Sequence, residues 1–367
     1  MKKILSFVTI LSFVFCLTVN VSGESELGGG KYTTMKDESG RVITRTAHPM
    51  VSGDRYLDSE NKLYQVTRVK GNTAIAKPVK SGSSPWDTFR KFFSGVFNPN
   101  NFRAEVKAKG PIGIYHTHSD ESYLPSDGVS SREGNGGIFQ VGETLANGFE
   151  AAGIPVAYSK TPHDPHDAMS YDRSRRTAAQ LLKKSPICLL DVHRDAVPRE
   201  EYTTVINSRP VTKVQLVVGR QNPNFQANNN FAQQIKAVVD QKYPGLIKGI
   251  FYGKGKYNQD LGPRALLLEF GANTNSKEAA ERSAWIFASA AKEVVYGNVG
   301  NRLVNRGSLR SLFWILAALV GGVGLFLLIN KRGLKNIREF TGAVGETGPE
   351  DEKKQDGQNP GPGDNGQ

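Results

Sequence analysis

The segment "PIGIYHTHSDESY", from Pro111 to Tyr123, gathers side chains that can bind a metal ion or transfer a proton. It holds two of the six histidines in the 367-residue chain, His116 and His118, followed by Asp120 and Glu121. The apolar run "PIGIY" before them predicts a strand that ends at the histidines. Alternate residues of a strand point to opposite faces, so at most one of the two histidines is expected to be a ligand unless the strand has ended.

Two further apolar runs end in residues of the same chemical type. His193 ends "ICLLDVH" and Glu269 ends "ALLLE", while Glu143 lies in the helical segment that follows the first histidine pair. Two histidines and a carboxylate are a common ligand set for catalytic zinc, with water in the fourth position. An additional glutamate could take a proton from that water and pass it to a leaving amine.

Alternating strands and helices are expected to position these residues. The predicted strands are 111–115, 154–159, 187–193, 212–219, 249–254 and 264–271, and the predicted helices are 136–153, 174–185, 230–245 and 276–297. This order predicts an α/β fold with a mainly parallel sheet and helices on both faces. Ligands of such sheets bind beyond the carboxyl ends of the strands, where His118, His193 and Glu269 are expected to converge.

Three segments flank or precede this domain, which is expected to occupy residues 103–298. Residues 30–80 contain "LYQVTRV" and "TAIAKPV", separated by the turn signal "KGN", and predict a small β unit. Residues 81–102 begin with "SGSS" and carry spaced aromatic residues, which predicts a linker with a short amphipathic helix. Residues 341–367 are rich in Gly, Pro, Asn, Asp and Glu and are predicted to be disordered.

Two apolar segments predict export and membrane anchoring. Residues 1–23 have the layout of a signal peptide, with an uncleaved anchor as the alternative. Residues 312–329 carry no charge and would form a helix of about 27 Å, which predicts a transmembrane helix over residues 311–330. Lys331, Arg332, Lys335 and Arg338 follow it, so the folded body is expected outside the cytoplasm and the tail inside.

The net charge indicates the class of partner, and the remaining reactive residues are expected to lie outside the site. The net charge of +12 is spread along the body, which favours an anionic cell-wall polymer over nucleic acid for an exported chain. Cys188 lies in an apolar run and is expected to be a buried thiol. His163 and His166 stand beside prolines and predict an exposed turn, and His48 has no evident partner.

Three segments resemble the stage II sporulation protein P family. They are "IYHTHSDESY", "LLDVHRD" and "LLLEFGANTNSKEAAERS", and the last is also similar to the glutamate segment of zinc-dependent N-acetylmuramoyl-L-alanine amidases. The resemblance covers roughly residues 110–296 and implies an amidase-like domain. It implies that His118, Glu143 and His193 bind Zn²⁺ and that Glu269 is the catalytic carboxylate.

The match departs from the amidase pattern between the first two of these ligands. His118 and Glu143 are separated by an enlarged loop, and Glu121 within it is a rival second ligand. The helical context of "VGETLANGFEAAG" favours Glu143 over Glu121. His116 is interpreted as supporting the site or the fold.

The resemblance also implies a function and a location. It implies a membrane-anchored peptidoglycan hydrolase that cuts the N-acetylmuramoyl-L-alanine amide, and family members are also credited with cutting stem-peptide crosslinks. It implies work on septal wall during spore engulfment, with homologues of stage II sporulation proteins D and M as partners. The expected C-terminal span departs from the N-terminal anchor expected of this family. The alternative function is a non-catalytic anchored module that binds peptidoglycan and recruits or activates another hydrolase.

Overall fold

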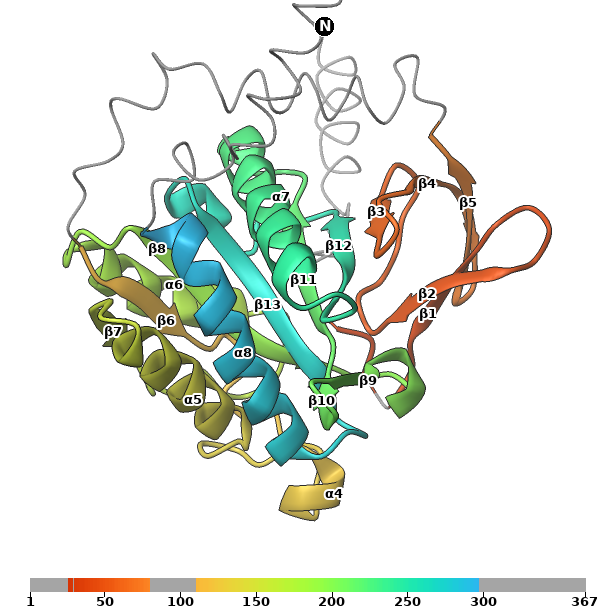
Figure 1. The fold of residues 1–367 in the computed structure, drawn as a ribbon. Coiled ribbons are helices and arrows are strands. Elements are labelled where there is room, and N and C mark those ends of the chain that lie inside the picture. The colour runs from red at the N-terminus through yellow and green to blue at the C-terminus, as the bar shows by residue number, and fades with distance from the viewer. Residues whose placement is uncertain (1–25, 29, 80–109, 297–367) are drawn as a thin grey trace, which may run out of the picture. The chain divides into compact units, whose positions relative to one another are not determined.

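An eleven-stranded sheet runs through the part of the chain that the computed structural model describes, residues 26–28, 30–79 and 110–296 (Figure 1). Its strand order is β2-β1-β5-β4-β3-β12-β11-β13-β8-β6-β7, and β9 and β10 form a separate hairpin. The strands are β1 Thr33–Lys36, β2 Val42–Thr46, β3 Arg55–Asp58, β4 Leu63–Lys70, β5 Thr73–Pro78, β6 Ile112–Tyr115, β7 Val156–Tyr158, β8 Cys188–Asp195, β9 Thr203–Ile206, β10 Arg209–Thr212, β11 Val214–Gly219, β12 Ile247–Gly253 and β13 Ala265–Ala272.

The sheet is mixed, which corrects the prediction of a mainly parallel one. Strands β7, β6, β8 and β13 are parallel to their neighbours in this group, whereas β11 pairs with β13 in the antiparallel direction. The reversal arises because the chain leaves β8 through the β9–β10 hairpin and not through a crossover helix. A parallel return would require such a crossover.

The small β unit predicted at residues 30–80 is present as β1 to β5. It continues the main sheet, because β3 pairs antiparallel with β12 from Gly249–Asp58 to Tyr252–Arg55. Figure 1 shows these strands beside β12, at one end of the sheet. Side chains of this unit, including Tyr56 and Val66, share a buried cluster with Phe251 of the main domain.

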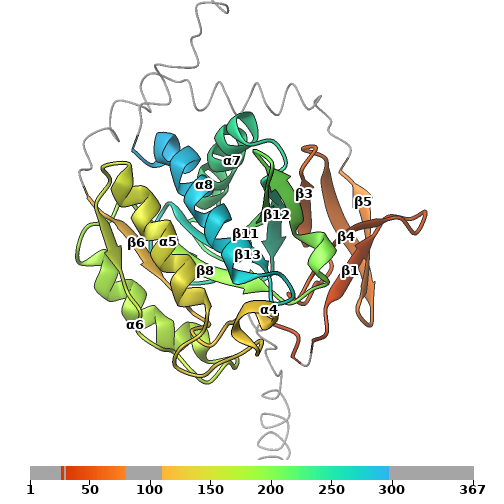
Figure 2. The ribbon, with the colours of Figure 1, turned by 60° about the horizontal axis from the view of Figure 1, so that its bottom comes forward.

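Helices cover both faces of the main domain, as the sequence predicts. The helices are α4 Leu124–Asp127, α5 Ile138–Ala151, α6 Ser170–Leu182, α7 Phe225–Lys242 and α8 Lys277–Val295, with short 3-10 turns η1 Arg199–Glu201 and η2 Gln259–Leu261. Helices α5, α7 and α8 pack over one face of the sheet and form the main core with it (Figure 2). Helix α6 packs on the other face, where Ala178 and Leu181 contact Tyr115 and Leu189.

Strand alternation separates an apolar face from a polar one in the middle of the sheet. Leu268 and Phe270 of β13 and Val192 of β8 belong to the main core. Glu269 lies between Leu268 and Phe270, and His193 follows Val192. Because successive side chains of a strand point to opposite faces, Glu269 and His193 both point to the other face of the sheet. The register pairs Glu269 with His193 on β8 and with Gln215 on β11. A row of buried polar side chains therefore crosses three neighbouring strands.

Several sequence predictions concern residues outside this description. The signal peptide at 1–23, the linker at 81–102, the membrane span at 311–330 and the tail at 341–367 all lie there. Among the residues that are described, no helix is both long and apolar enough to cross a membrane.

Candidate metal centre and its neighbouring glutamate

Three buried side chains offer metal-binding atoms to one point. His118 Nδ1 lies 3.2 Å from Glu121 Oε1, and His193 Nδ1 lies 3.1 Å from the same oxygen. The three side chains are almost fully buried, and their donor atoms all lie within 4.8 Å of one another. This is a group that could hold a metal ion.

The donor set fits zinc in number, type and spacing. Two donors bound to one tetrahedral zinc ion, each about 2.0–2.1 Å from it, lie about 3.3–3.4 Å apart. The two nitrogen–oxygen distances are close to that value. Three protein ligands leave the fourth position for water or substrate, which is the arrangement of catalytic zinc sites and not of structural ones.

Neighbouring groups orient these donors. His193 Nε2 lies 2.9 Å from Asp191 Oδ1, and Glu121 Oε2 accepts a hydrogen bond of 2.8 Å from the backbone N–H of Arg194. Thr117 holds Asp191 in turn through its backbone N–H and its hydroxyl group. A carboxylate on the second nitrogen of a histidine ligand is common in metal sites, because it fixes the orientation of the ring.

The electrostatics of the group favour a cation at this point. Burial works to raise the pKa of Glu121, but His193, Arg194 and the hydrogen bond from His118 hold it well below its usual range. Burial works to lower the pKa of His193, but Asp191 and Glu121 hold it well above its usual range. The surroundings therefore stabilise both the carboxylate and a positive charge beside it.

Glu143, the second ligand implied by the resemblance, does not join this group. It lies on α5 with its side chain 50% exposed, and its carboxylate pairs with Lys160 Nζ at 2.8 Å. The rival, Glu121, takes the position between the two histidines. The helix turns Glu143 toward solvent, because Gly142 beside it packs on the ring of His116, and any Cβ there would lie 2.5 Å from His116 Nε2.

Glu269 is fully buried next to the metal-binding group. His193, its register partner, lies on the adjacent strand, about 4.8 Å away in sheet geometry. Glu269 Oε1 lies 2.8 Å from His48 Nε2. Glu269 Oε2 accepts hydrogen bonds from Tyr202 Oη at 2.7 Å and from Gln215 Nε2 at 2.6 Å. Tyr202 Oη also lies 2.9 Å from Asp195 Oδ2, so its single proton can serve only one carboxylate at a time.

His193 and Glu269 lie inside their strands and not at the ends. Strand β8 continues to Asp195 and β13 to Ala272. The two side chains meet because they share a face of the sheet. The prediction that they converge at one edge is therefore corrected. Only His118 follows the end of its strand, since β6 stops at Tyr115.

A chain of aromatic contacts joins the two parts of the site. The rings of His118 and Tyr171 lie 5.6 Å apart, those of Tyr171 and Tyr257 5.6 Å, and those of Tyr257 and His48 5.9 Å. All three contacts are edge-to-face, a favourable arrangement for aromatic pairs. These rings form a continuous wall from the metal-binding group to the partner of Glu269.

His48 is the site residue that the sequence did not reveal. It follows β2 in the N-terminal unit, its side chain is 2% exposed, and it lies 221 positions from its partner Glu269. Burial works to lower its pKa, but the charge and hydrogen bond of Glu269 raise the pKa of His48 to about 8. His48 is therefore largely protonated at neutral pH and pairs with Glu269 as a cation.

This pair predicts a pH dependence of stability. Because the pKa of His48 is higher in the folded state, its protonation adds about 2 kcal/mol to the free energy of unfolding. This contribution is fully present below about pH 6.5 and is lost as the pH rises through about 8. Urea unfolding of the full chain in detergent should therefore show a higher midpoint at pH 6 than at pH 9. In His48→Gln this part of the pH dependence should disappear. An unchanged pH dependence in His48→Gln would contradict the assignment.

The other histidines of the two quoted motifs have structural or supporting places. His116 is buried, with Nδ1 2.7 Å from the carbonyl of Val192 and Nε2 2.8 Å from Tyr158 Oη, and it does not belong to the three clustered donors. His163 is buried as well, 2.7 Å from Thr177 Oγ1. His166 stacks on the ring of His118 at 3.7 Å. The predicted exposed turn is therefore wrong for the buried His163, whereas Pro162 and Pro165 are exposed and the side chain of His166 is 24% exposed.

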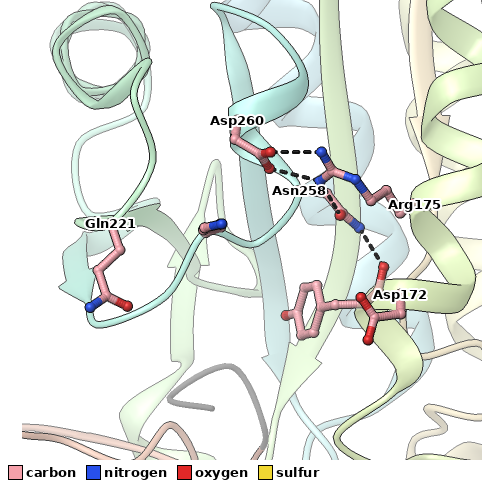
Figure 3. A pocket seen from close by; sticks show the side chains of 7 residues that line it. Asp172, Arg175, Gln221, Asn258 and Asp260 are labelled. Carbon is pink, nitrogen blue, oxygen red and sulfur yellow. Dashed lines mark hydrogen bonds and ion pairs between the residues drawn. The ribbon is translucent and has the colours of Figure 1, made fainter. Parts of the chain in front are cut away.

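A polar cavity of about 440 Å³ lies beside this wall of aromatic rings (Figure 3). Tyr171, which contacts the ring of His118, also lines the cavity. Arg175 of α6 points into it and binds both carboxylate oxygens of Asp260, at 2.9 and 2.7 Å. The cavity therefore adjoins the metal-binding group and has charged groups of both signs on its walls. Its lining also includes Asp172, Gln221, Lys256 and Asn258.

A mixed α/β sheet that carries a buried His–Glu–His group beside a hydrogen-bonded glutamate defines an α/β protein with a candidate metal centre. Comparison with known families gives a narrower answer. The family model described as stage II sporulation protein P matches residues 44–292. The chain belongs to this family, and the match includes His48 and all four site residues on the sheet and its loops.

Individual proteins are similar over about half of the chain. Stage II sporulation protein P of Bacillus subtilis (strain 168) is 33% identical over 207 residues, and the chain spans about half the length of this curated relative (51% of this chain and 52% of the relative). Among solved structures, the amidase AmiC2 of Nostoc punctiforme is 14% identical with a TM-score of 0.29, covering 50% of this chain and 96% of that one. The CwlD amidase of Clostridioides difficile, solved in complex with the GerS lipoprotein, is 13% identical with a TM-score of 0.31, covering 51% and 98%.

Proposed function

We propose that the protein is a peptidoglycan hydrolase that cuts the amide between the lactyl group of N-acetylmuramic acid and L-alanine. The observation that carries this proposal is the burial of His118, Glu121 and His193 as one donor set beside the carboxylate of Glu269. Membership of the stage II sporulation protein P family supports a role in sporulation. We further propose cleavage of stem-peptide crosslinks as a second activity of the same site.

His118, Glu121 and His193 would hold the zinc ion. A zinc ion bound there supplies a Lewis acid that polarises the scissile carbonyl and lowers the pKa of water. Glu269 would accept a proton from the attacking water and then donate it to the leaving amine of L-alanine. His48, Tyr202 and Gln215 fix the position of this carboxylate.

We also propose that the enzyme is anchored in the cell membrane by the apolar segment 311–330, with its folded body outside the cytoplasm. The basic residues that follow this segment support that orientation. Septal wall during engulfment would then be the substrate. Homologues of stage II sporulation proteins D and M are the proposed partners.

Digestion of purified sacculi by the full chain in detergent tests the activity. We expect soluble peptides with a free L-alanine amino group, about one zinc ion per chain, loss of release after chelation, and its return when zinc is added. After the products are digested with a muramidase, mass spectrometry separates free stem peptides, which report amide cleavage, from uncrosslinked disaccharide peptides, which report crosslink cleavage. Binding to sacculi without release of either product would instead favour the non-catalytic binding module.

A further inference from the structure

Arg194 lies beside the metal-binding group, and one of its guanidinium nitrogens makes no hydrogen bond to the described residues. Its side chain is 5% exposed, its Nη2 donates to the carbonyl of Ser130 at 3.1 Å, and its Nε donates to that of Ser122 at 3.4 Å. Its Nη1 has no hydrogen-bond partner among the described residues. A buried donor without an acceptor is costly, so this nitrogen marks a position where an acceptor would be stabilised.

His166 has a ring nitrogen near the same place that makes no hydrogen bond to the described residues. Its ring stacks on His118, and its Nδ1 lies 3.0 Å from Asp120 Oδ1. Its Nε2 is buried and has no hydrogen-bond partner among the residues that the structure describes. Asp120 therefore contacts the other ring nitrogen of His166. His166 Nε2 and Arg194 Nη1 both lie near the carboxylate of Glu26.

Glu26 marks that point with a carboxylate. Its Oε2 lies 3.5 Å from Arg194 Nη1 and 3.8 Å from His166 Nε2, and its side chain is 8% exposed. Charged hydrogen bonds of this type are about 2.7–2.9 Å long, so the carboxylate lies near both nitrogens but is not hydrogen-bonded to either of them. The short segment that carries Glu26 is held by the bond from Leu27 N to the carbonyl of Ala47, at 2.9 Å.

We propose that Arg194, beside the ring of His166, forms a subsite for a free carboxylate of the substrate's stem peptide, and that Glu26 occupies this subsite until the substrate displaces it. The inference rests on the proposed function, since it names the group of a peptide substrate that the same site recognises. The other nearby carboxylate, Glu121, is 3.9 Å from Arg194 Nη1 and is held by His118, His193 and the Arg194 N–H. Glu121 is therefore held by other groups and leaves Arg194 Nη1 available to a ligand.

Isothermal titration of the full chain in detergent tests the subsite without turnover. The probes are L-alanyl-D-glutamate and its diamide, which have nearly the same shape and differ in their carboxylates. We expect the acid to bind at least about tenfold more tightly than the diamide, since a hydrogen bond to a charged group contributes that much. Glu26→Gln should tighten binding of the acid and leave the diamide unchanged, because the internal competitor loses its charge.

Arginine variants complete the test. Arg194→Gln should remove the preference for the acid, whereas Arg176→Gln, an exposed arginine on α6, should keep it. If Arg194→Gln does not fold, Glu26→Gln alone decides. Equal affinities of the two dipeptides, or an unchanged acid affinity in Glu26→Gln, would overturn the subsite.

Neither dipeptide contains the amide proposed to be cut. A failure of sacculus hydrolysis with a retained acid preference would therefore reject the proposed function and not the subsite.

Discussion

Glu269→Gln should abolish release of peptides from sacculi while zinc binding is retained. The substitution keeps the shape of the side chain but removes the group that would accept and donate the proton. General acid–base catalysis contributes about 10²–10⁴-fold, so we expect a loss of at least about 100-fold. Zinc content should stay near that of the unmodified chain, because Glu269 is not among the three clustered donors.

The position of Glu269 makes the control important. Three neighbours hydrogen-bond to this carboxylate, so a general loss of structure must be separated from a loss of chemistry. Retained zinc together with an unchanged circular dichroism spectrum would show that the fold is intact. Substantial hydrolysis by Glu269→Gln under those conditions would exclude Glu269 as the acid–base group.

Glu121→Gln should release the metal and stop hydrolysis together. The change removes the only negative charge in the donor set, and it leaves the buried side chains of His193 and Arg194 without their shared counter-charge. We expect zinc content to fall from about one ion per chain to a small fraction of that. Plasma emission spectrometry after dialysis gives the measurement.

Glu143→Gln is the matched control for this experiment. Glu143 is the glutamate that the resemblance favours as a ligand, yet its side chain is half exposed and pairs with Lys160. The variant should keep its zinc and its activity, because a solvated ion pair contributes little. The reverse result, with zinc lost in Glu143→Gln and kept in Glu121→Gln, would restore the ligand set that the resemblance implies.

The contrast between these two glutamates shows where sequence reasoning reaches its limit. Glu269 could be selected because it is the one charged residue of β13, and His193 because it closes the largely apolar run "ICLLDVH". The choice between Glu121 and Glu143 depends on the path of the loop after β6. That path is fixed by a contact between Glu121 and the backbone of Arg194, 73 positions away. No local pattern carries this information.

The same limit explains the other differences. The antiparallel direction of β11 follows from the β9–β10 hairpin, which connects β8 to β11. The pattern of strands in the sequence does not distinguish such a hairpin from a helical crossover. His48 stands before a proline in a segment with no periodic signal. Its unit is brought to the main sheet by long-range contacts, which include the pairing of β3 with β12 and the hydrogen bond from Ala47 N–H to Asp195 Oδ1. The α/β class, most elements and the grouping of His118 with His193 could be predicted from sequence, and Glu121 could be named only as the rival of Glu143. The long-range pairings were not.

The contact between His48 and Glu269 has a consequence for how the protein matures. It joins the second strand of the fold to the last one, across 221 positions of the chain. Contacts between such distant positions form late, because a long loop must close before they are gained. A partly synthesised chain, still lacking β13, holds His48 but not its carboxylate partner. The imidazole of His48 and the carboxylate of Glu269 can therefore come together only after β13 has been synthesised.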